Sequence, residues 1–340
     1  MPLVAAKCTS CGATLSVDST KDAAICKYCG TPFIIEKAIN HYHTTQNISG
    51  SVVNVYGGNI TDFVIRAGTL VNYQGSETEI EIPDTVKIIG KEAFCGCQGL
   101  TQVVIPKSVV KIEEKAFHGS GIQEIIVPES VKTIGAGAFS YCRNLKKARL
   151  PHTLDYILPD CLADDMFRGC TELVDFDIPK GIKYIGCSAF ADCIQLDIKI
   201  PSTVKAFGKR AFAGCKKLKT IVIPMEMTNI GDETFSRCSN LSSVHIPQGL
   251  KTIGHYAFND CSNLIDVVIP NSVISIGQFA FKNCTRLESL NIPDSVSDIS
   301  SSTFEGCDNL TIYASSRWKR AHKYAIQSLK KPKKWSNFLL

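Results

Sequence analysis

The chain has 340 residues, of which 44% are hydrophobic, and a formal net charge of +5 at pH 7. No run of about 18 apolar residues occurs, so the sequence excludes a transmembrane helix. Its 16 cysteines follow no apolar leader segment, and cysteines in such a chain are typical of a reducing compartment. We therefore expect a cytoplasmic protein.

Two Cys-x-x-Cys pairs begin the chain, Cys8 with Cys11 and Cys26 with Cys29. Each pair can present two thiolates from one tight turn, and two such turns complete a tetrahedral site. Zn²⁺ is the metal that this donor set favours, and iron is the alternative. Residues 1–35 resemble a zinc ribbon, whose fold would depend on its metal. Because basic residues are scarce between the pairs, a structural or protein-contact role is favoured over nucleic-acid binding.

A polar, glycine-rich segment over residues 36–62 is predicted to be a linker. Its two histidines, His41 and His43, are not expected to bind the metal because four thiolates already complete the site. Residues 63–82 then read as a β-hairpin with a turn at Ala67-Gly68, placed to cap the repeats that follow.

A unit of about 23 residues then repeats ten times over residues 83–313. Such a period predicts a solenoid. Within each unit, a Leu-x-x-Ile-x-Ile-Pro phrase alternates with period two and predicts a strand, while an Ile-Gly-x-x-Ala-Phe phrase is expected to turn the corner into a short helical or 3-10 segment. The prolines that mark the units are Pro83, Pro106, Pro128, Pro151, Pro179, Pro201, Pro224, Pro247, Pro270 and Pro293.

A cysteine follows the phenylalanine of most units by three residues. Stacked coils would space these side chains by about 4.8 Å, wider than a disulfide prefers, so we expect buried free thiols that act as small hydrophobic groups. Ser120 takes this position in the second unit, which argues against a required chemical role. The ladder comprises Cys97, Cys142, Cys170, Cys193, Cys215, Cys238, Cys261, Cys284 and Cys307.

The unit Ile-Pro-x-x-Val-x-x-Ile-Gly-x-x-Ala-Phe-x-x-Cys-x-x-Leu resembles the BspA-type leucine-rich repeat over about residues 63–313. The resemblance implies a right-handed, leucine-rich-repeat solenoid with a parallel β-sheet along one face and short helical or 3-10 turns along the other. It also implies surface-mediated binding without catalytic residues. Several members of the family are cell-surface adhesins, so an adhesin-like repeat protein is an alternative. The combination of ribbon, linker and repeats is similar to that of bacterial proteins.

A protein partner is expected to bind the sheet face, where the strand residues outside the core point outward. Along this face the middle coils carry charged residues and both ends are apolar. The candidate partner-binding residues are Lys147, Arg149, Asp175, Asp177, Lys199, Thr220, Val222 and His245. The fourth unit adds five residues around Pro159 to Ala163 within an acidic stretch, which is either a functional loop or neutral drift. Its spacing matches no known loop motif for a divalent cation.

Residues 314–340 form a basic tail, because eight lysines and arginines and no acidic residue follow Asp308. Ser315 or Ser316 can cap a helix that bears Trp318, which predicts a cap for the last coil or, with its charge, a patch for nucleic acid. No phosphate loop, nucleophile elbow or paired-histidine motif indicates an enzyme. The sequence thus favours a non-enzymatic protein-interaction module, with a nucleic-acid-associated factor as the alternative.

Overall fold

The computed structural model describes residues 62–316 apart from 153 and 155–160, together with Trp318 and the backbone of four strands before residue 35. Those four strands form two antiparallel pairs. Strand β1 (Leu3–Lys7) pairs with β2 (Thr14–Asp18), and β3 (Ala23–Ile25) pairs with β4 (Pro32–Ile34). The predicted linker, including His41 and His43, lies outside the described residues.

A β-hairpin opens the solenoid. Strand β5 (Phe63–Arg66) pairs antiparallel with β6 (Thr69–Tyr73), and β6 pairs in parallel with the first short strand of the coils, β8 (Ile88–Ile89). The turn between them has positive φ values of 46° at Ala67 and 74° at Gly68. The hairpin therefore occupies the strand edge that the first coil would otherwise leave open.

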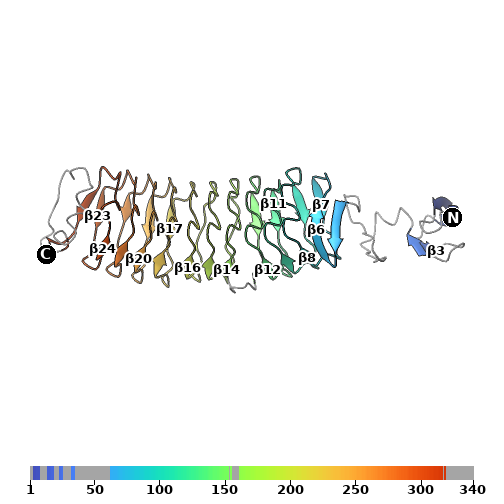
Figure 1. The fold of residues 1–340 in the computed structure, drawn as a ribbon, viewed down its shortest axis with the longest axis horizontal. Helices are drawn as coiled ribbons and strands as arrows, with labels where there is room; N and C mark the ends of the chain where they lie inside the picture. The colour runs from blue at the N-terminus through green and yellow to red at the C-terminus, as the bar shows by residue number, and fades with distance from the viewer. Residues whose placement is uncertain are drawn as a thin grey trace.

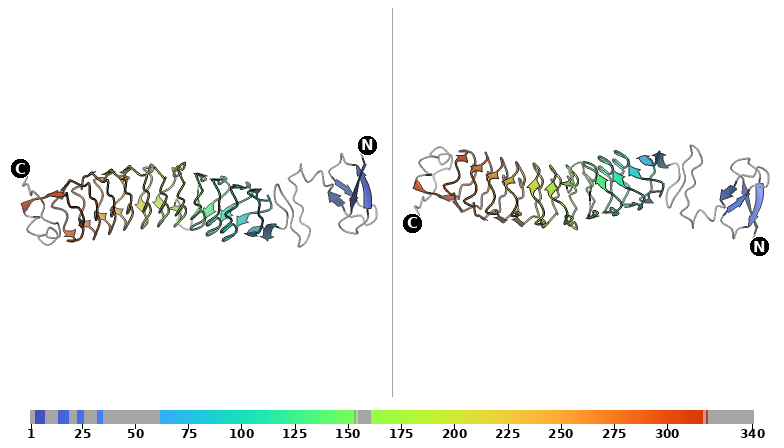
Figure 2. Two further views of the ribbon diagram at one scale, coloured as in Figure 1. Left: turned by 90° about the horizontal axis from the view of Figure 1, so that it is seen from above. Right: turned by 90° about the horizontal axis from the view of Figure 1, so that it is seen from below.

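About ten coils stack along the long axis, and most of them contribute one strand to each of two rows (Figures 1 and 2). Row A is formed from the Leu-x-x-Ile-x-Ile phrases, and its central residues are buried while their neighbours point outward. Its pairing is parallel and in register, as between Thr220 and Ser243. Row A comprises β7 (Glu79–Glu81), β9 (Gln102–Val104), β11 (Glu124–Ile126), β13 (Lys147–Arg149), β17 (Thr220–Val222), β19 (Ser243–His245), β21 (Asp266–Val267), β23 (Ser289–Asn291) and β25 (Thr311–Tyr313).

Row B runs along the other side of the stack and corrects the predicted fold. The sequence predicted short helical or 3-10 turns there, whereas the described coils carry a second set of parallel two-residue strands. In Figure 1 the labels of rows A and B follow the upper and lower sides of the stack. Besides β8, row B comprises β10 (Lys111–Ile112), β12 (Thr133–Ile134), β14 (Cys161–Leu162), β15 (Tyr184–Ile185), β16 (Ala206–Phe207), β18 (Asn229–Ile230), β20 (Thr252–Ile253), β22 (Ser275–Ile276) and β24 (Asp298–Ile299).

The Ala-Phe phrase forms irregular turns because its backbone alternates between two kinds of hydrogen bond. In the first coil the Ala93 and Cys95 N–H groups bond locally to Gly90 and Glu92, while the Phe94 N–H donates to Ala116 of the next coil at 2.7 Å. Residues two before and two after each phenylalanine have left-handed φ values in most coils, for example 57° at Glu92. A helix requires every N–H to bond within its own segment, so this alternation prevents one.

Ten phenylalanines fill the centre of the solenoid, one from each coil. Consecutive rings stack with centroids 4.8–5.8 Å apart and planes 6–18° from parallel. Tyr73 of the hairpin lies 5.5 Å from Phe94 and closes the N-terminal end of the column. At the other end the buried Trp318 donates its indole N–H to the carbonyl oxygen of Val296 at 2.8 Å, and its backbone N–H donates to Ser315 Oγ at 3.1 Å. Ser315 thus acts as the helix cap.

Gly121 is the residue where the stack tolerates a side chain least, and we expect Gly121→Ala to destabilise the protein by about 3 kcal/mol. A Cβ at this position would overlap the carbonyl oxygen of Gln98 and approach its carbon to 2.8 Å. Both partners are backbone atoms of the neighbouring coil and cannot rotate away. Chemical denaturation monitored by circular dichroism measures the change.

Gly99 in that neighbouring coil provides the matched control, because a Cβ there would meet nothing within 4 Å. Gly99→Ala should be neutral, or slightly stabilising through the lower entropy of the unfolded chain. Equal losses for the two variants would contradict the steric explanation.

Candidate interaction surfaces

The outer surface of row A carries the eight candidate partner-binding residues, all of them exposed or half-buried. They belong to five consecutive coils, and the parallel register aligns Thr220 with Ser243 and Val222 with His245. In row A, the described residues between β13 and β17 form no strand, and Lys147 forms a single β-bridge with Asp175. The sheet-face residues identified from the alternation thus lie on one surface.

Several of the charged side chains in the middle of this surface form ion pairs. Lys147 Nζ lies 2.5 Å from Glu124 Oε1, and Arg149 Nη2 lies 2.6 Å from Asp175 Oδ1. Arg149 also donates through Nη1 to the carbonyl oxygen of Asp175 at 3.0 Å. Because these side chains are well exposed, each pair contributes little to stability. Their effect is to hold a fixed pattern of charge on the surface.

Apolar side chains flank this charged region on both sides. Ile126 is 57% exposed toward the N-terminal end, and Val222 and Val268 are 63% and 67% exposed toward the C-terminal end. A shallow groove of about 680 Å³ lies at the N-terminal patch, lined by residues that include Val104, Ile126 and Lys107. Together these exposed β-branched side chains form apolar surface of the kind that marks protein-binding sites.

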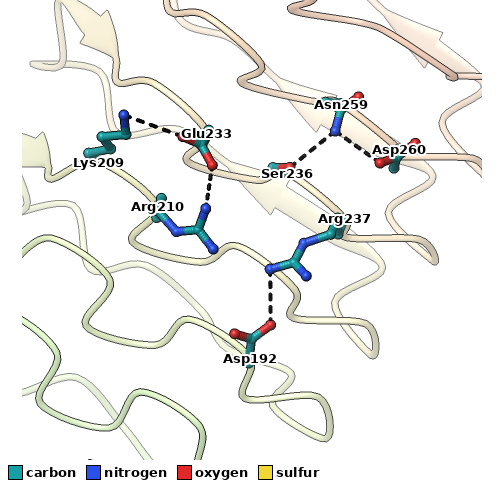
Figure 3. A network of polar contacts seen from close by, with 8 residues as sticks. All are labelled: Asp192, Lys209, Arg210, Glu233, Ser236, Arg237, Asn259 and Asp260. Atoms are coloured by element: carbon teal, nitrogen blue, oxygen red, sulfur yellow. Dashed lines mark hydrogen bonds and ion pairs between the residues drawn. The ribbon is translucent and has the colours of Figure 1, made fainter.

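A second polar surface, which was not predicted from the sequence, follows the turns (Figure 3). Arg237 reaches past the coil of Gly214 to place Nη2 3.2 Å from Asp192 Oδ1. A side chain on Gly214 would collide with the same oxygen atom, so glycine in the intervening coil keeps this path open. Glu233 pairs with Arg210 and with Lys209, the latter at 3.3 Å.

The network continues into the next coils through amide groups. Asn259 donates to Ser236 Oγ at 3.4 Å and to Asp260 Oδ2 at 2.9 Å (Figure 3). Asn283 of the following coil donates to Asp260 Oδ1 at 2.8 Å. Ser236 and Asn259 are 23 positions apart, as are Asp260 and Asn283, so no local motif joins these coils. Reading the sequence in columns of one residue per coil would have placed them together.

The cysteine column is buried from Cys142 onward, while Cys97 is half-buried, and the buried thiols are more than small hydrophobic groups. Each described thiol from Cys142 onward donates to the carbonyl oxygen of the phenylalanine one coil earlier, as Cys142 Sγ does to Phe117 at 3.0 Å. Burial raises the pKa of Cys142 and of Cys238 to about 12. Ser120 fits the column because its hydroxyl is also a small hydrogen-bonding group, and its Oγ lies 3.4 Å from Cys142 Sγ.

The predicted metal ligands Cys8, Cys11, Cys26 and Cys29 lie outside the described residues. Each pair falls between the two strands of an antiparallel hairpin, β1 with β2 and β3 with β4. Among the residues whose side chains are described, no group of three histidine, cysteine or acidic residues could hold a metal ion.

The acidic insertion is described only in part, because residues 155–160 lie outside the structure. Asp164 accepts the backbone N–H of Cys187 at 2.6 Å, and Asp165 pairs with Arg168 at 3.3 Å. Both carboxylates therefore serve contacts within the stack.

No helix in the described part of the chain is long and apolar enough to cross a membrane.

The fold and these surfaces define a leucine-rich-repeat-type parallel β-solenoid, a class of non-enzymatic repeat protein. Residues 69–197, 160–265 and 251–336 match the BspA type leucine rich repeat region. The chain belongs to the BspA-type leucine-rich repeat family, as its repeat pattern indicated, and the prediction of a non-enzymatic protein is confirmed by that membership.

Several solved structures are similar to this chain. A leucine-rich repeat protein from Bacteroides ovatus is 24% identical, with 93% of this chain and 98% of that chain covered and a TM-score of 0.46. A leucine rich cell surface protein from Faecalibacterium prausnitzii is 26% identical, with 73% and 63% covered and a TM-score of 0.44. A leucine-rich repeat protein from Eubacterium ventriosum is 21% identical, with 78% and 81% covered and a TM-score of 0.48. The curated proteins include no match.

Proposed function

We propose that this protein is a non-enzymatic scaffold that binds a protein partner on the outer surface of row A. The observation that carries the proposal is the order of side chains on that surface, with exposed apolar residues on both sides of a fixed charged centre. Apolar contacts supply affinity in protein interfaces, while charges set orientation and selectivity. A partner with apolar patches around a polar centre would match this pattern.

Affinity capture from a native bacterial lysate, followed by direct titration of the purified captured protein, tests the proposal. We expect Ile126→Asp and Val222→Asp to abolish binding, because each places a charge in an apolar patch of row A. Tyr184→Asp is the matched control, since Tyr184 is an exposed apolar residue on row B, with 42% of its surface accessible. Equal binding by all three variants would contradict the proposal. Capture of nucleic acid, lost on removal of residues 314–340, would favour the alternative function.

The N-terminal segment is proposed to be a structural zinc ribbon that accompanies the solenoid. Support comes from the donor set of Cys8, Cys11, Cys26 and Cys29 and from the position of each pair between hairpin strands. Four thiolates satisfy the preference of Zn²⁺ for a closed tetrahedral site. The zinc would supply folding energy to a unit too small to form a sufficient core.

Metal analysis provides the test of the ribbon. We expect one equivalent of zinc in the purified protein and its loss in the double variant Cys8→Ser/Cys11→Ser, measured by mass spectrometry. Cys95→Ser is the control, because Cys95 is an exposed free thiol of the solenoid. One equivalent of iron would replace the zinc assignment, and unchanged metal content in the double variant would refute the site.

We also propose a cytoplasmic location, supported by the thiols of the solenoid. The eleven cysteines whose side chains are described are free, and two of them, Cys95 and Cys187, are exposed. Exposed free thiols persist in a reducing compartment. Fractionation of cells that express the tagged full chain would test this, and recovery with the cell envelope would support the adhesin-like alternative.

A further inference from the structure

A concave site lies on the row B side near the C-terminal end of the solenoid. It is a hollow of about 320 Å³ that spans four successive coils. The residues that line it supply hydroxyl, amide, imidazole and carboxylate groups, and no lysine or arginine is among them. The polar side chains that the argument uses are Asp232, Thr252, His255, Ser275, Gln278 and Asp298.

Hydrogen bonds fix several of these groups in place. The backbone N–H of His255 donates to Asp232 Oδ1 at 2.9 Å, and the backbone N–H of Gln278 donates to His255 Nδ1 at 3.0 Å. Ser275 Oγ donates to Asp298 Oδ2 at 2.7 Å. Because Nδ1 accepts, the neutral imidazole carries its proton on Nε2. Each bond uses one atom of its acceptor residue, which leaves a second carboxylate oxygen on each aspartate and a ring N–H for a ligand.

Two aromatic residues continue directly from the segments that line this hollow. Tyr256 follows His255 and Phe279 follows Gln278, and their rings stack with centroids 4.8 Å apart and planes 21° from parallel. Tyr256 is 37% exposed. Lys282 Nζ lies 5.0 Å from the centroid of the Phe279 ring, and its charge is compensated by Glu305, whose Oε1 lies 2.8 Å away.

The backbone makes this aromatic pair unusual. Tyr256 and Phe279 have φ values of 55° and 58°, in the left-handed region where bulky residues are genuine outliers. The same position in other coils holds small or charged residues, namely Glu92, Lys115, Gly137, Asp165, Ser188, Arg210 and Glu233. Fold formation therefore does not require an aromatic side chain here, and the stacked pair is a feature that the equivalent positions of the other coils do not share.

A hollow at the equivalent position in the N-terminal half is lined by different side chains and serves as a comparison. It is lined by Lys91, Lys111, Glu113 and Glu114, which form ion pairs of 3.1 Å from Lys91 to Glu114 and 2.8 Å from Lys111 to Glu113. Its polar groups thus compensate one another. The lining of the C-terminal hollow contains no lysine or arginine, so its two aspartates have no cationic side chain within the lining.

The chemistry of the C-terminal hollow selects one class of ligand. Without a lysine or arginine in its lining it disfavours phosphates and carboxylates, and its polar groups disfavour a purely apolar molecule. Fixed donors and acceptors, with an exposed aromatic ring on the residue that follows His255, suit a molecule with many neutral hydroxyl groups and one apolar C–H face. From the juxtaposition of the polar hollow at Asp232, His255 and Asp298 with the Tyr256–Phe279 pair, we propose that this site binds a neutral saccharide.

Isothermal titration of the full-length protein with neutral hexasaccharides tests the proposal, the probes being α-linked and β-linked glucose, β-linked mannose and β-linked N-acetylglucosamine. We expect at least one probe to bind with a Kd below about 1 mM. Tyr256→Ser and Asp298→Ala should each weaken that binding at least tenfold, while Tyr256→Phe should restore it. Thermal unfolding of each variant separates a lost site from a lost fold.

Two controls make the result decisive. Lys115→Ser changes the position equivalent to Tyr256 in the N-terminal half and should leave saccharide binding unchanged. Val222→Asp should do the same, because Val222 belongs to row A, so failure of the partner-binding proposal would not affect this one. The proposal is overturned if no probe binds below about 10 mM, or if Tyr256→Ser and Asp298→Ala bind within twofold of the wild type while folded.

Discussion

Phe190→Ala is expected to lower the free energy of unfolding by about 3–5 kcal/mol. Phe190 is fully buried in the middle of the column and stacks on Phe167 at 5.8 Å and on Phe212 at 5.5 Å. Truncation removes its own buried surface and also leaves a void between two rings that rigid coils hold apart. In a repeat array, stability depends on the contacts between neighbouring units, so a loss at the centre weakens the coupling of the two halves.

Denaturant titration followed by circular dichroism measures this loss, and Phe279→Ala supplies the matched control. That variant removes the same atoms from a half-buried surface ring, so we expect a change of about 1 kcal/mol or less. A broadened or two-step transition for Phe190→Ala alone would show that the halves have uncoupled. Similar losses for both variants would contradict the central role of the column.

The sequence was sufficient to predict the stacking of coils because each coil contributes one residue of each kind to a shared core. Phe190, Cys193 and Leu196 recur at fixed intervals, and burial permits few substitutes at such positions. Row B was missed because its strands are two residues long, which is too short for a period-two pattern to be recognised. The left-handed turns were missed because residues such as Glu92 and Arg210 carry no preference for that conformation, which the bonds between coils impose.

The two candidate surfaces also differ in how far they could be predicted from the sequence. The row A surface could be predicted, because alternation within one strand determines which side chains point outward. The C-terminal hollow could not be predicted. Its lining residues Asp232, His255 and Gln278 follow one another at intervals of 23 residues, and none of them stands out within its own repeat. Contact between them arises only when the coils stack in register, which is a property of the fold rather than of any local motif.

The stack also buries many copies of one ionisable group, the cysteine thiol, and this makes the stability of the protein depend strongly on pH. Burial raises the pKa of the thiol in Cys142, Cys170, Cys193, Cys215, Cys238, Cys261 and Cys284. A group whose pKa is higher in the folded state stabilises that state below its unfolded pKa, here about 8.5. The stabilisation is lost as the pH rises above that value, because the unfolded chain releases protons that the folded chain retains.

We therefore expect cooperative unfolding within about one to two pH units above 8.5. Seven thiols that stay protonated in the folded state and ionise in the unfolded state lower the free energy of unfolding by on the order of 10 kcal/mol per pH unit. That is comparable to the whole stability of an ordinary domain. Denaturant titrations in the presence of a reductant, at pH 7, 8, 9 and 10, measure the dependence.

Cys238→Ser identifies the thiols as the cause. A serine hydroxyl can donate to the carbonyl oxygen of Phe212 as the Cys238 thiol does at 3.2 Å, and Ser120 shows that the column accepts a buried serine. The variant should lose some stability at pH 7, because burying a hydroxyl costs more than burying a thiol, but the hydroxyl does not ionise in this range. Relative to the wild type it should then gain about tenfold in the folding equilibrium constant for each pH unit above 8.5. Parallel pH profiles for the two proteins would show that alkaline unfolding has another origin, such as the loss of lysine ion pairs at the surface.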